Sequence, residues 1–325
     1  MDKFRRIGAG FCGTVWTSPC EESVHFGRAF KREDGGPGRS LLNDFRMHQS
    51  VLEAREKLSE LPGFESSSVH IYVPRFAEFI GPEDGWWNSN LEYFPSGYTA
   101  CNMILSERIP AVSQKARELL IDRYCPSSFA AEIKTSEANE DCLIRPYLGR
   151  RRYNAAAHTR PSRFKAFSLR NYPLHLDQME ELGLDAADLV HYVEVMAEAL
   201  AMMHWLAGID ANDVEFVLAP PRSAEKTPAV ISNKLGDHVM WILDFDCCNR
   251  LSFDIDGVDQ AVTAFFKNDP FYPRPNSSSA LWAAFRRKYI EVSNDILQTR
   301  LLNDNDKDDI QKLPEAFMQR IEERI

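Results

Sequence analysis

The chain has 325 residues, and its 38 Lys and Arg against 48 Asp and Glu give a formal net charge of −10. With 44% apolar and 26% charged residues, the composition excludes collagen-like, fibrous and wholly disordered proteins. No run approaches the roughly 18 apolar residues of a membrane span, and no apolar run follows the first residues as in a signal peptide. We therefore expect a cytoplasmic protein without a membrane partner. An evenly spread acidic charge would also argue against nucleic acid.

Cysteine use favours a reducing compartment. The number is odd, the spacing is irregular and no C-x₂-C pair occurs, so neither a disulfide framework nor a zinc finger is expected. The sequence predicts no metal site of this kind and a set of free thiols. The seven are Cys12, Cys20, Cys101, Cys125, Cys142, Cys247 and Cys248.

The N-terminal third predicts a small sheet that contains one helix. Ser40 is a suitable N-cap for a helix that runs to about Glu60, where Leu61-Pro-Gly ends it. The predicted strands are Phe4–Ile7, a second around Ser23–Phe30, then Val73–Ile80 and Cys101–Ile109.

The rest of the chain predicts mostly helices. One covers Ser113–Tyr124, and the clearest begins at Asp185 and stops at Gly208, a natural left-handed position. Two short apolar strands follow, Phe216–Ala219 and Val239–Phe245, and two or three helices lie in the tail.

Three glycines, Gly8, Gly10 and Gly13, follow the first strand in the pattern G-x-G-x-x-G. Glycines let a backbone approach phosphates closely, but dinucleotide folds use the same pattern before a helix. Here the β-rich Thr14-Val-Trp follows, which favours the flap of a kinase-type nucleotide pocket. A glycine-rich hairpin without catalytic meaning is the alternative.

Lys31 ends the next predicted strand, eighteen residues after Gly13. A kinase-type fold places a lysine there to hold phosphates, paired with an acid on the following helix. Asp44 and Glu53 are both candidates for that acid. The alternative for Lys31 is a solvated surface lysine.

The strongest motif is a set of acids around the two C-terminal strands. Asp210 and Glu215 are five residues apart, as in the kinase catalytic loop H-R-D-x-x-x-x-N, and Asp244-Phe-Asp246 stands where D-F-G would. Asp213 lies between the first two. Because unpaired buried carboxylates are costly, such convergence favours a functional site over solvated loop acids.

The departures from that pattern exclude a standard protein kinase. Gly208 and Ile209 replace the His and Arg, Glu215 replaces the metal-binding Asn, and Asp246 replaces the Gly. Crowded carboxylates raise one another's pKa, so one of them could act as a general base, or the set could hold a divalent cation.

We therefore predict an α+β, two-lobed protein-kinase-like fold, with a small N-terminal β-rich lobe and a larger helical C-terminal lobe. The expected divisions are 1–112 for the first lobe with its glycine flap, 113–185 for a connecting region, and 186–325 for the helical lobe with the acidic loop.

A basic segment interrupts the acidic chain. Residues 142–176 hold eight cations and no acid, which leaves −18 over the remainder, and aromatic residues are interleaved. Arginine binds phosphate bidentately and aromatic faces stack on unpaired bases, so this segment predicts an RNA contact at the rim of the cleft. Pairing with acids elsewhere is the alternative. The candidate contact residues are Arg145, Arg150, Arg151, Arg152, Arg163, Lys165 and Arg170.

Several stretches together resemble a fungal family usually labelled a zinc-finger protein or a domain of unknown function. They include Ile7-Gly-Ala-Gly-Phe-Cys-Gly-Thr-Val, Leu143-Ile-Arg-Pro-Tyr-Leu-Gly-Arg-Arg and, most specifically, Asp213-Val-Glu-Phe-Val-Leu. The resemblance implies a degenerate kinase-like fold. It also implies an arginine-containing cyclodipeptide synthase, which takes amino acids from aminoacyl-tRNAs and forms cyclo-Arg-Xaa diketopiperazines in secondary metabolism.

On this reading Asp210, Asp213, Glu215 and Asp244 are catalytic, and arginyl-tRNA with a second aminoacyl-tRNA are the partners. No cofactor and no stable protein partner are expected. Glu215 and Asp213 would hold the substrate arginine while Asp210 acts as base. Gly8, Gly10, Gly13, Lys31, Asp44 and Asp246 would bind substrate or phosphate.

Two alternatives remain open. One is a small-molecule phosphotransferase that uses Mg-ATP through Lys31, Asp210 and Asp244. The other is a non-catalytic pseudokinase that serves as a binding module, which the lost catalytic-loop and D-F-G companions favour.

Overall fold

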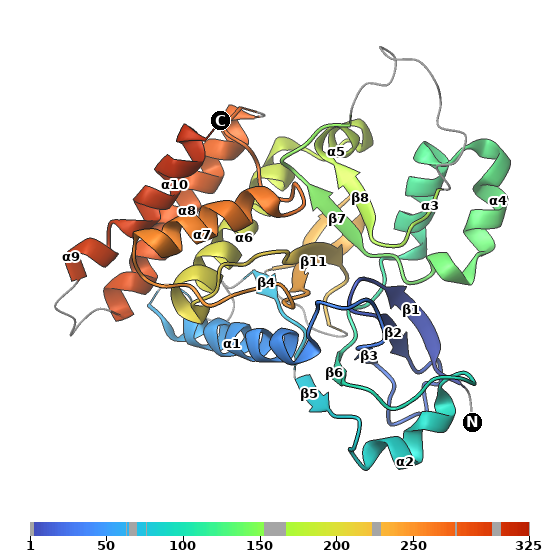
Figure 1. The fold of residues 1–325 in the computed structure, drawn as a ribbon. Helices are drawn as coiled ribbons and strands as arrows, with labels where there is room; N and C mark the ends of the chain where they lie inside the picture. Colours follow the sequence, from blue (N-terminus) through green and yellow to red (C-terminus); the bar gives the residue numbers. More distant parts are fainter. Residues whose placement is uncertain are drawn as a thin grey trace.

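The computed structural model describes residues 3–62, 64, 70–75, 77–152, 167–222, 229–276, 278–300 and 307–324. Over these residues the chain is a mixed α+β protein with two sheets, which confirms the predicted class (Figure 1). Helices from the C-terminal half gather on one side, and the N-terminal sheet lies at the opposite end of the view.

The first sheet is antiparallel and has the order β1-β2-β3-β6-β5. The predicted second strand starts late, because Ser23 and Gly27 (φ +72°) build turns where strand was expected. The strands are β1 Arg5–Ala9, β2 Thr14–Thr17, β3 Arg28–Arg32, β5 Ala77–Ile80 and β6 Met103–Glu107.

Helix α1, Leu41–Glu60, follows the first three strands, as predicted. Its cap is the Ser40 side chain, which accepts a hydrogen bond from the Asn43 N–H at 3.4 Å. Leu41, Asp44, His48 and Val51 recur at helical spacing on its buried face, so one carboxylate shares that face with apolar residues.

The second sheet combines segments that lie far apart in the sequence. Its order is β10-β11-β9-β7-β8, and β4 pairs with β11 in parallel. Its strands are β4 Ile71–Tyr72, β7 Ile144–Tyr147, β8 Tyr172–His175, β9 Glu215–Ala219, β10 Ile231–Asn233 and β11 Gly236–Leu243.

Two predictions change here. Of the strand predicted over Val73–Ile80, only Ala77–Ile80 is a strand, and this is β5 of the first sheet. The preceding residues Ile71–Tyr72 form β4 in the second sheet, and Pro74, which has no N–H to donate to a ladder, lies between the two strands. The segment 113–185, predicted as a connection, supplies β7 and β8 to the second sheet.

The long predicted helix is confirmed as α6, Ala186–Met202, capped by the Asp185 side chain. It continues as a π-helical turn, Met203–Ala207, and stops at Gly208, whose φ is +63°. This turn packs against α1, and α6 packs against α8.

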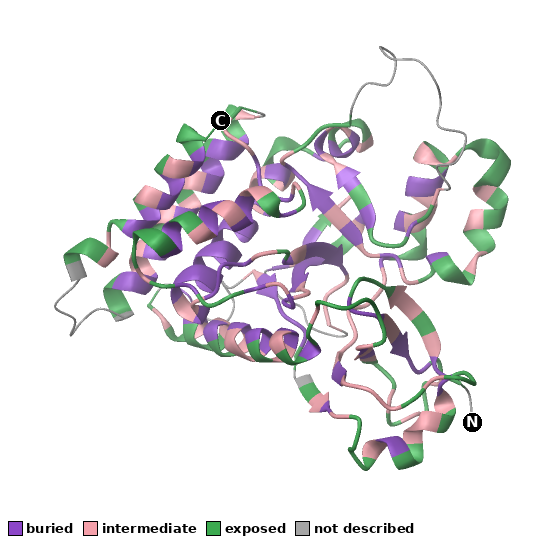
Figure 2. Ribbon diagram, in the orientation of Figure 1, coloured by how far each residue is buried: buried purple, intermediate pink, exposed green. Residues whose placement is uncertain are grey.

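Most of the remaining helices bury one face and expose the other, whereas α4 and the described side chains of α9 include no buried residue (Figure 2). They are α2 Trp86–Asn90, α3 Gln114–Tyr124, α4 Ser127–Thr135, α5 Leu176–Leu182, α7 Ile255–Lys267, α8 Ser279–Arg300, α9 Lys307–Ile310 and α10 Leu313–Glu323, with short 3₁₀ turns at Leu91–Tyr93 and Glu137–Asn139.

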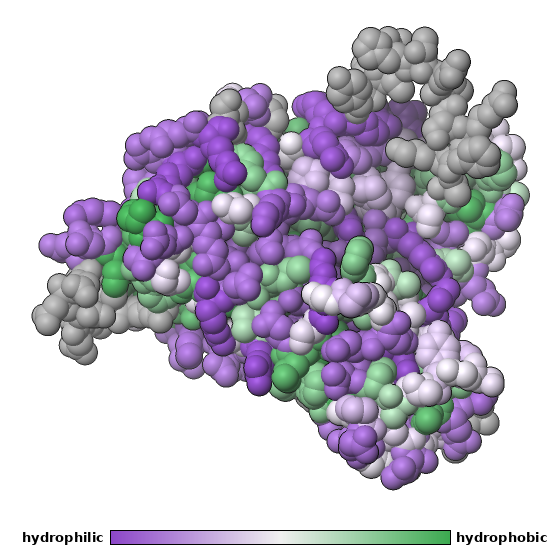
Figure 3. Space-filling view, in the orientation of Figure 1, coloured by the Kyte–Doolittle hydropathy of each residue, from purple (hydrophilic) through white to green (hydrophobic). Residues whose placement is uncertain are grey.

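The visible face of the molecule is mostly hydrophilic, with apolar side chains in small scattered groups (Figure 3). Among the described residues, no helix combines the length and apolar character needed to cross a bilayer.

Candidate active site

A cavity of about 380 Å³ lies where the two sheets face each other. The β1–β2 hairpin, α1, β6, β7 and the ends of β9 and β11 all contribute to its lining. Most of the predicted site residues line it: Gly8, Gly10, Gly13, Lys31, Asp44, Asp213, Glu215, Asp244 and Asp246. The sequence motifs therefore do converge, although they come from five separate segments.

Lys31 lies between two carboxylates in the lining of the cavity. Its Nζ is 2.6 Å from Asp44 Oδ2 and 2.7 Å from Asp244 Oδ1. Burial alone would lower the pKa of Lys31, but the two carboxylates outweigh it and hold that pKa well above its ordinary value. Lys31 is therefore a fixed cation.

The structure selects Asp44 over Glu53 as the helix partner of Lys31. Asp44 is buried, and its Oδ1 also accepts the Phe245 N–H at 3.0 Å, while Glu53 is exposed. Burial alone would raise the pKa of Asp244, but Lys31 more than offsets this and lowers it.

A second cation, Arg39, also lines the cavity. Arg39 Nη1 and Nη2 lie 3.2 and 3.1 Å from Asp213 Oδ2, and Nη1 lies 3.0 Å from both oxygens of Asp246. Its guanidinium also contacts the thiol of Cys247. Nothing in the sequence pattern pointed to Arg39.

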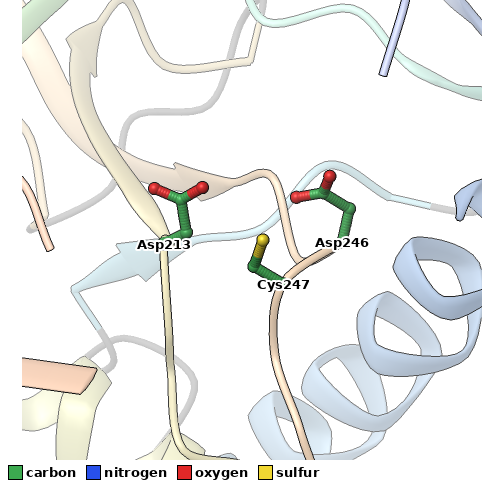
Figure 4. Close-up of side chains that lie close together, drawn as sticks. All are labelled: Asp213, Asp246 and Cys247. Atoms are coloured by element: carbon green, nitrogen blue, oxygen red, sulfur yellow. The ribbon is translucent and has the colours of Figure 1, made fainter. Parts of the chain in front are cut away.

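Asp213, Asp246 and Cys247 project into one space from the loops before β9 and after β11 (Figure 4). Their ligand atoms lie within 4.8 Å of one another, and this is the one such group of potential metal ligands among the described residues. Arg39 already fills the space between them with positive charge. The set therefore fits a guanidinium better than a metal ion.

Glu215 is the carboxylate best suited to proton transfer. Its side chain is 19% exposed and pairs with Arg145. Burial raises the pKa of Glu215 to about 7; Arg145 acts in the opposite direction, and Asp244 adds to the rise. A carboxylate with this pKa can accept a proton near neutral pH.

Arg145 was predicted to contact tRNA, but it lies in the cavity lining. Besides Glu215 it reaches Asp269 Oδ2 at 3.5 Å, and the Tyr147 hydroxyl donates to the same oxygen at 2.5 Å. Arg145 therefore positions a carboxylate of the site and is not a free surface cation.

Asp210, predicted as the base, does not line the cavity. It is buried and accepts hydrogen bonds from the backbone N–H groups of Asn212 and Asn249, at 3.1 and 2.9 Å. The side chains of Asn249 and Gln260 add two more, at 3.2 and 2.8 Å. These bonds commit its oxygens to holding the loops that carry Asp213 and Asp246.

Those loops adopt strained backbone conformations. Ala211, Asp213 and Asp244 have φ values of +52°, +64° and +67°. Non-glycine residues persist in this region only when their surroundings hold them, and such residues gather at functional sites. The strain lies at the ends of β9 and β11, where the cavity is.

The other predicted tRNA contacts within the described residues divide into two groups. Arg151 and Arg152 form ion pairs with acids of α5, which are Glu180 for the first and Asp177 with Glu181 for the second. Arg150 and Arg170 are exposed and form no ion pair within the described ranges. Arg163 and Lys165 lie outside the described residues.

A family model described as a zinc finger protein matches residues 240–301, which include Asp244, Asp246 and Cys247. That segment contains no histidine and only the adjacent cysteines Cys247 and Cys248. All seven cysteines lie in the described part of the chain and are free. The match is therefore a likeness of sequence without a zinc-finger ligand set. No curated protein matches this chain.

Proposed function

We propose that this protein is a cytoplasmic, aminoacyl-tRNA-dependent cyclodipeptide synthase that forms arginine-containing diketopiperazines, as the family resemblance implies. A degenerate kinase-like fold, one lobe on each side of the cavity, belongs to this proposal. The observation that carries it is the binding site of the Arg39 side chain. There Asp213 and Asp246 hold a guanidinium group, in a cavity that Glu215 also lines.

In the proposed reaction the guanidinium of an arginyl ester binds Asp213 and Asp246. Glu215, in place of Asp210, takes a proton from the α-ammonium group of one aminoacyl ester. The freed amine attacks the ester carbonyl of the other, so a C–N bond forms, the C–O bond to one tRNA breaks, and the proton passes to that leaving oxygen. The remaining amine then closes the ring in the same way and releases the second tRNA.

The charge of the cavity supports this substrate class. Seven carboxylates and four cations line it, so it attracts an arginyl ester, which carries both a guanidinium and an ammonium group. An ester is already activated, so the reaction needs no nucleotide. The lining cations are Lys31, Arg39, Arg108 and Arg145, and the carboxylates are Asp44, Glu107, Asp141, Asp213, Glu215, Asp244 and Asp246.

The test is expression in a host without cyclodipeptide synthases, followed by mass spectrometry of extracts for a new arginine-containing cyclic dipeptide. We expect Glu215→Gln to reduce product at least about 100-fold, as the loss of a general base does. Glu53→Gln, an exposed change on α1, is the matched control. Product that survives RNase treatment of a lysate reaction, or an unaffected Glu215→Gln variant, would refute the proposal.

The Lys31 ion pairs favour a second candidate, a phosphotransferase that uses Mg-ATP. Kinases require a strand lysine paired with a helix acid and a metal-binding aspartate nearby, and Lys31, Asp44 and Asp244 have that relation. This candidate predicts thermal stabilisation by Mg-ATP and loss of activity in Lys31→Ala. The excess of carboxylates in the cavity lining, with Glu215 at the position of the metal-binding Asn, disfavours a polyphosphate here.

A further inference from the structure

The loop between β3 and α1 places Arg39, which precedes the helix cap Ser40, in the acidic part of the cavity. The guanidinium contacts Asp213 and Asp246 from the chain itself, and its side chain is only 24% exposed. Both carboxylates are therefore occupied before any ligand arrives. A ligand's guanidinium and Arg39 cannot take the same oxygens together.

This loop is bonded to the tip of the glycine hairpin. Gly35 N–H donates to the carbonyl of Cys12 and Gly36 N–H to that of Phe11, both at 3.0 Å. The Phe11 ring lies 5.6 Å from the Arg39 guanidinium carbon. We call Phe11–Gly13 together with Asp34–Arg39 the arginine lid.

The lid is fastened to the opposite wall at one further point. The Cys12 thiol donates to Asp246 Oδ2 at 2.9 Å, so hairpin and loop both end on the same carboxylate. Phe11 itself is 74% exposed, an unusual position for a large aromatic side chain. The lid therefore touches the cavity wall through polar groups, which solvent or a ligand can replace.

We propose that Arg39 is an internal occupant of the guanidinium subsite, and that the arginine lid must withdraw it before a substrate guanidinium can bind. The identity of the ligand rests on the proposed function. A ligand that binds only the open lid has its affinity reduced by the fraction of molecules that are open. Removing Arg39 removes that reduction.

The first experiment measures binding of L-arginine methyl ester by calorimetry. We expect Arg39→Ala to bind it about tenfold more tightly than the wild type, which corresponds to an open fraction of about one tenth. L-Lysine methyl ester, which has the same charge but no guanidinium, is expected to gain much less. Adding Asp246→Asn to Arg39→Ala is expected to abolish the gain.

A second variant keeps every charge in place. A Cβ at Gly35 would lie 2.3 Å from the Phe11 carbonyl oxygen and 2.6 Å from the Cys12 carbonyl carbon, so Gly35→Ala separates the loop from the hairpin. We expect it also to tighten binding of arginine methyl ester. Gly36→Ala is the matched control, since its nearest new contact would be 3.9 Å away.

Nitrogen NMR of Arg39 in the wild type gives a readout that needs no variant to fold. Its guanidinium signal should move to a solvent-exposed value as arginine methyl ester saturates the site. Equal affinity in the wild type, Arg39→Ala and Gly35→Ala, or an Arg39 signal that stays unchanged at saturation, would overturn the proposal. Tighter binding without any cyclic dipeptide product would retain the lid and reject the synthase.

Discussion

Glu215 and Arg145 form the pair whose ionisation controls the proposed chemistry. Glu215 acts as a base only when deprotonated, and its pKa is about 7. The rate of product formation should therefore rise with pH up to about 7 and level off above it. Because the Arg145 cation lowers that pKa, Arg145→Met should move the rising limb to higher pH.

The measurement is a pH–rate profile with purified aminoacyl-tRNAs. Arg145→Lys keeps a cation near Glu215 and should restore most of the wild-type profile. If Arg145 served tRNA binding instead, its removal would raise the KM for aminoacyl-tRNA and weaken the salt dependence of that binding. The rising part of the pH–rate profile would then stay at the same pH.

At this scale the sequence identified residue types better than roles. Asp44 could have been chosen over Glu53, because only Asp44 lies at helical spacing with Leu41, His48 and Val51. Arg39 could not have been found, since a loop side chain reaches its partners through tertiary structure alone. Asp210 was expected to act as the base because it stands at the Asp of the kinase catalytic loop. In this chain Gly208 and Ile209 replace the His and Arg of that loop.

Among the elements, the glycine hairpin makes one stability prediction. Gly13 has φ +146°, and a Cβ there would lie 2.2 Å from the Arg32 carbonyl oxygen. Gly13→Ala should therefore destabilise the protein by about 1–3 kcal/mol, the usual cost of such strain. Gly10, in the same hairpin, has no atom within 4 Å of a new Cβ.

Urea unfolding measures both variants. We expect a lower midpoint for Gly13→Ala and almost no change for Gly10→Ala. Equal midpoints would show that the hairpin yields without strain, and would weaken the argument that its tip holds a defined position over the cavity.

Local signals predicted the helices well. Ser40 caps α1 as predicted, and the helices predicted to start at Ser113 and Asp185 begin there with those side chains as caps. Gly208 stops the helical segment that begins at Asp185, as predicted. Capping depends on neighbours in sequence, so these signals can be read locally. Strands were predicted less well. β7 and β8 depend on partners far along the chain, and their short segments carry no clear alternation.

For the whole molecule, the distribution of charge matters more than its sum. Arg151 and Arg152 are neutralised by acids of α5, whereas Arg150 and Arg170 are exposed without an ion pair in the described ranges. Losing Arg150 and Arg170 should therefore weaken tRNA binding more than losing Arg151 and Arg152. The slope of log affinity against log salt should fall by about one per lost phosphate contact.

Filter binding of tRNA at several salt concentrations compares two double variants. One carries Arg150→Ala with Arg170→Ala, and the other carries Arg151→Ala with Arg152→Ala. Equal losses of affinity would mean that tRNA breaks the α5 ion pairs when it binds. No loss in either variant would place the tRNA elsewhere, and would leave the basic segment as an internal contact of the fold.

The first turn of α1 connects Arg39 to Asp44. Ser40, the cap of this helix, directly follows Arg39. One end of this turn is pinned to Asp213 and Asp246, and the other holds Lys31. The two halves of the cavity are thus connected through a single turn of helix. If an anion that draws Lys31 away from Asp44 loosens Arg39, then a guanidinium ligand must strengthen binding of that anion by the same factor.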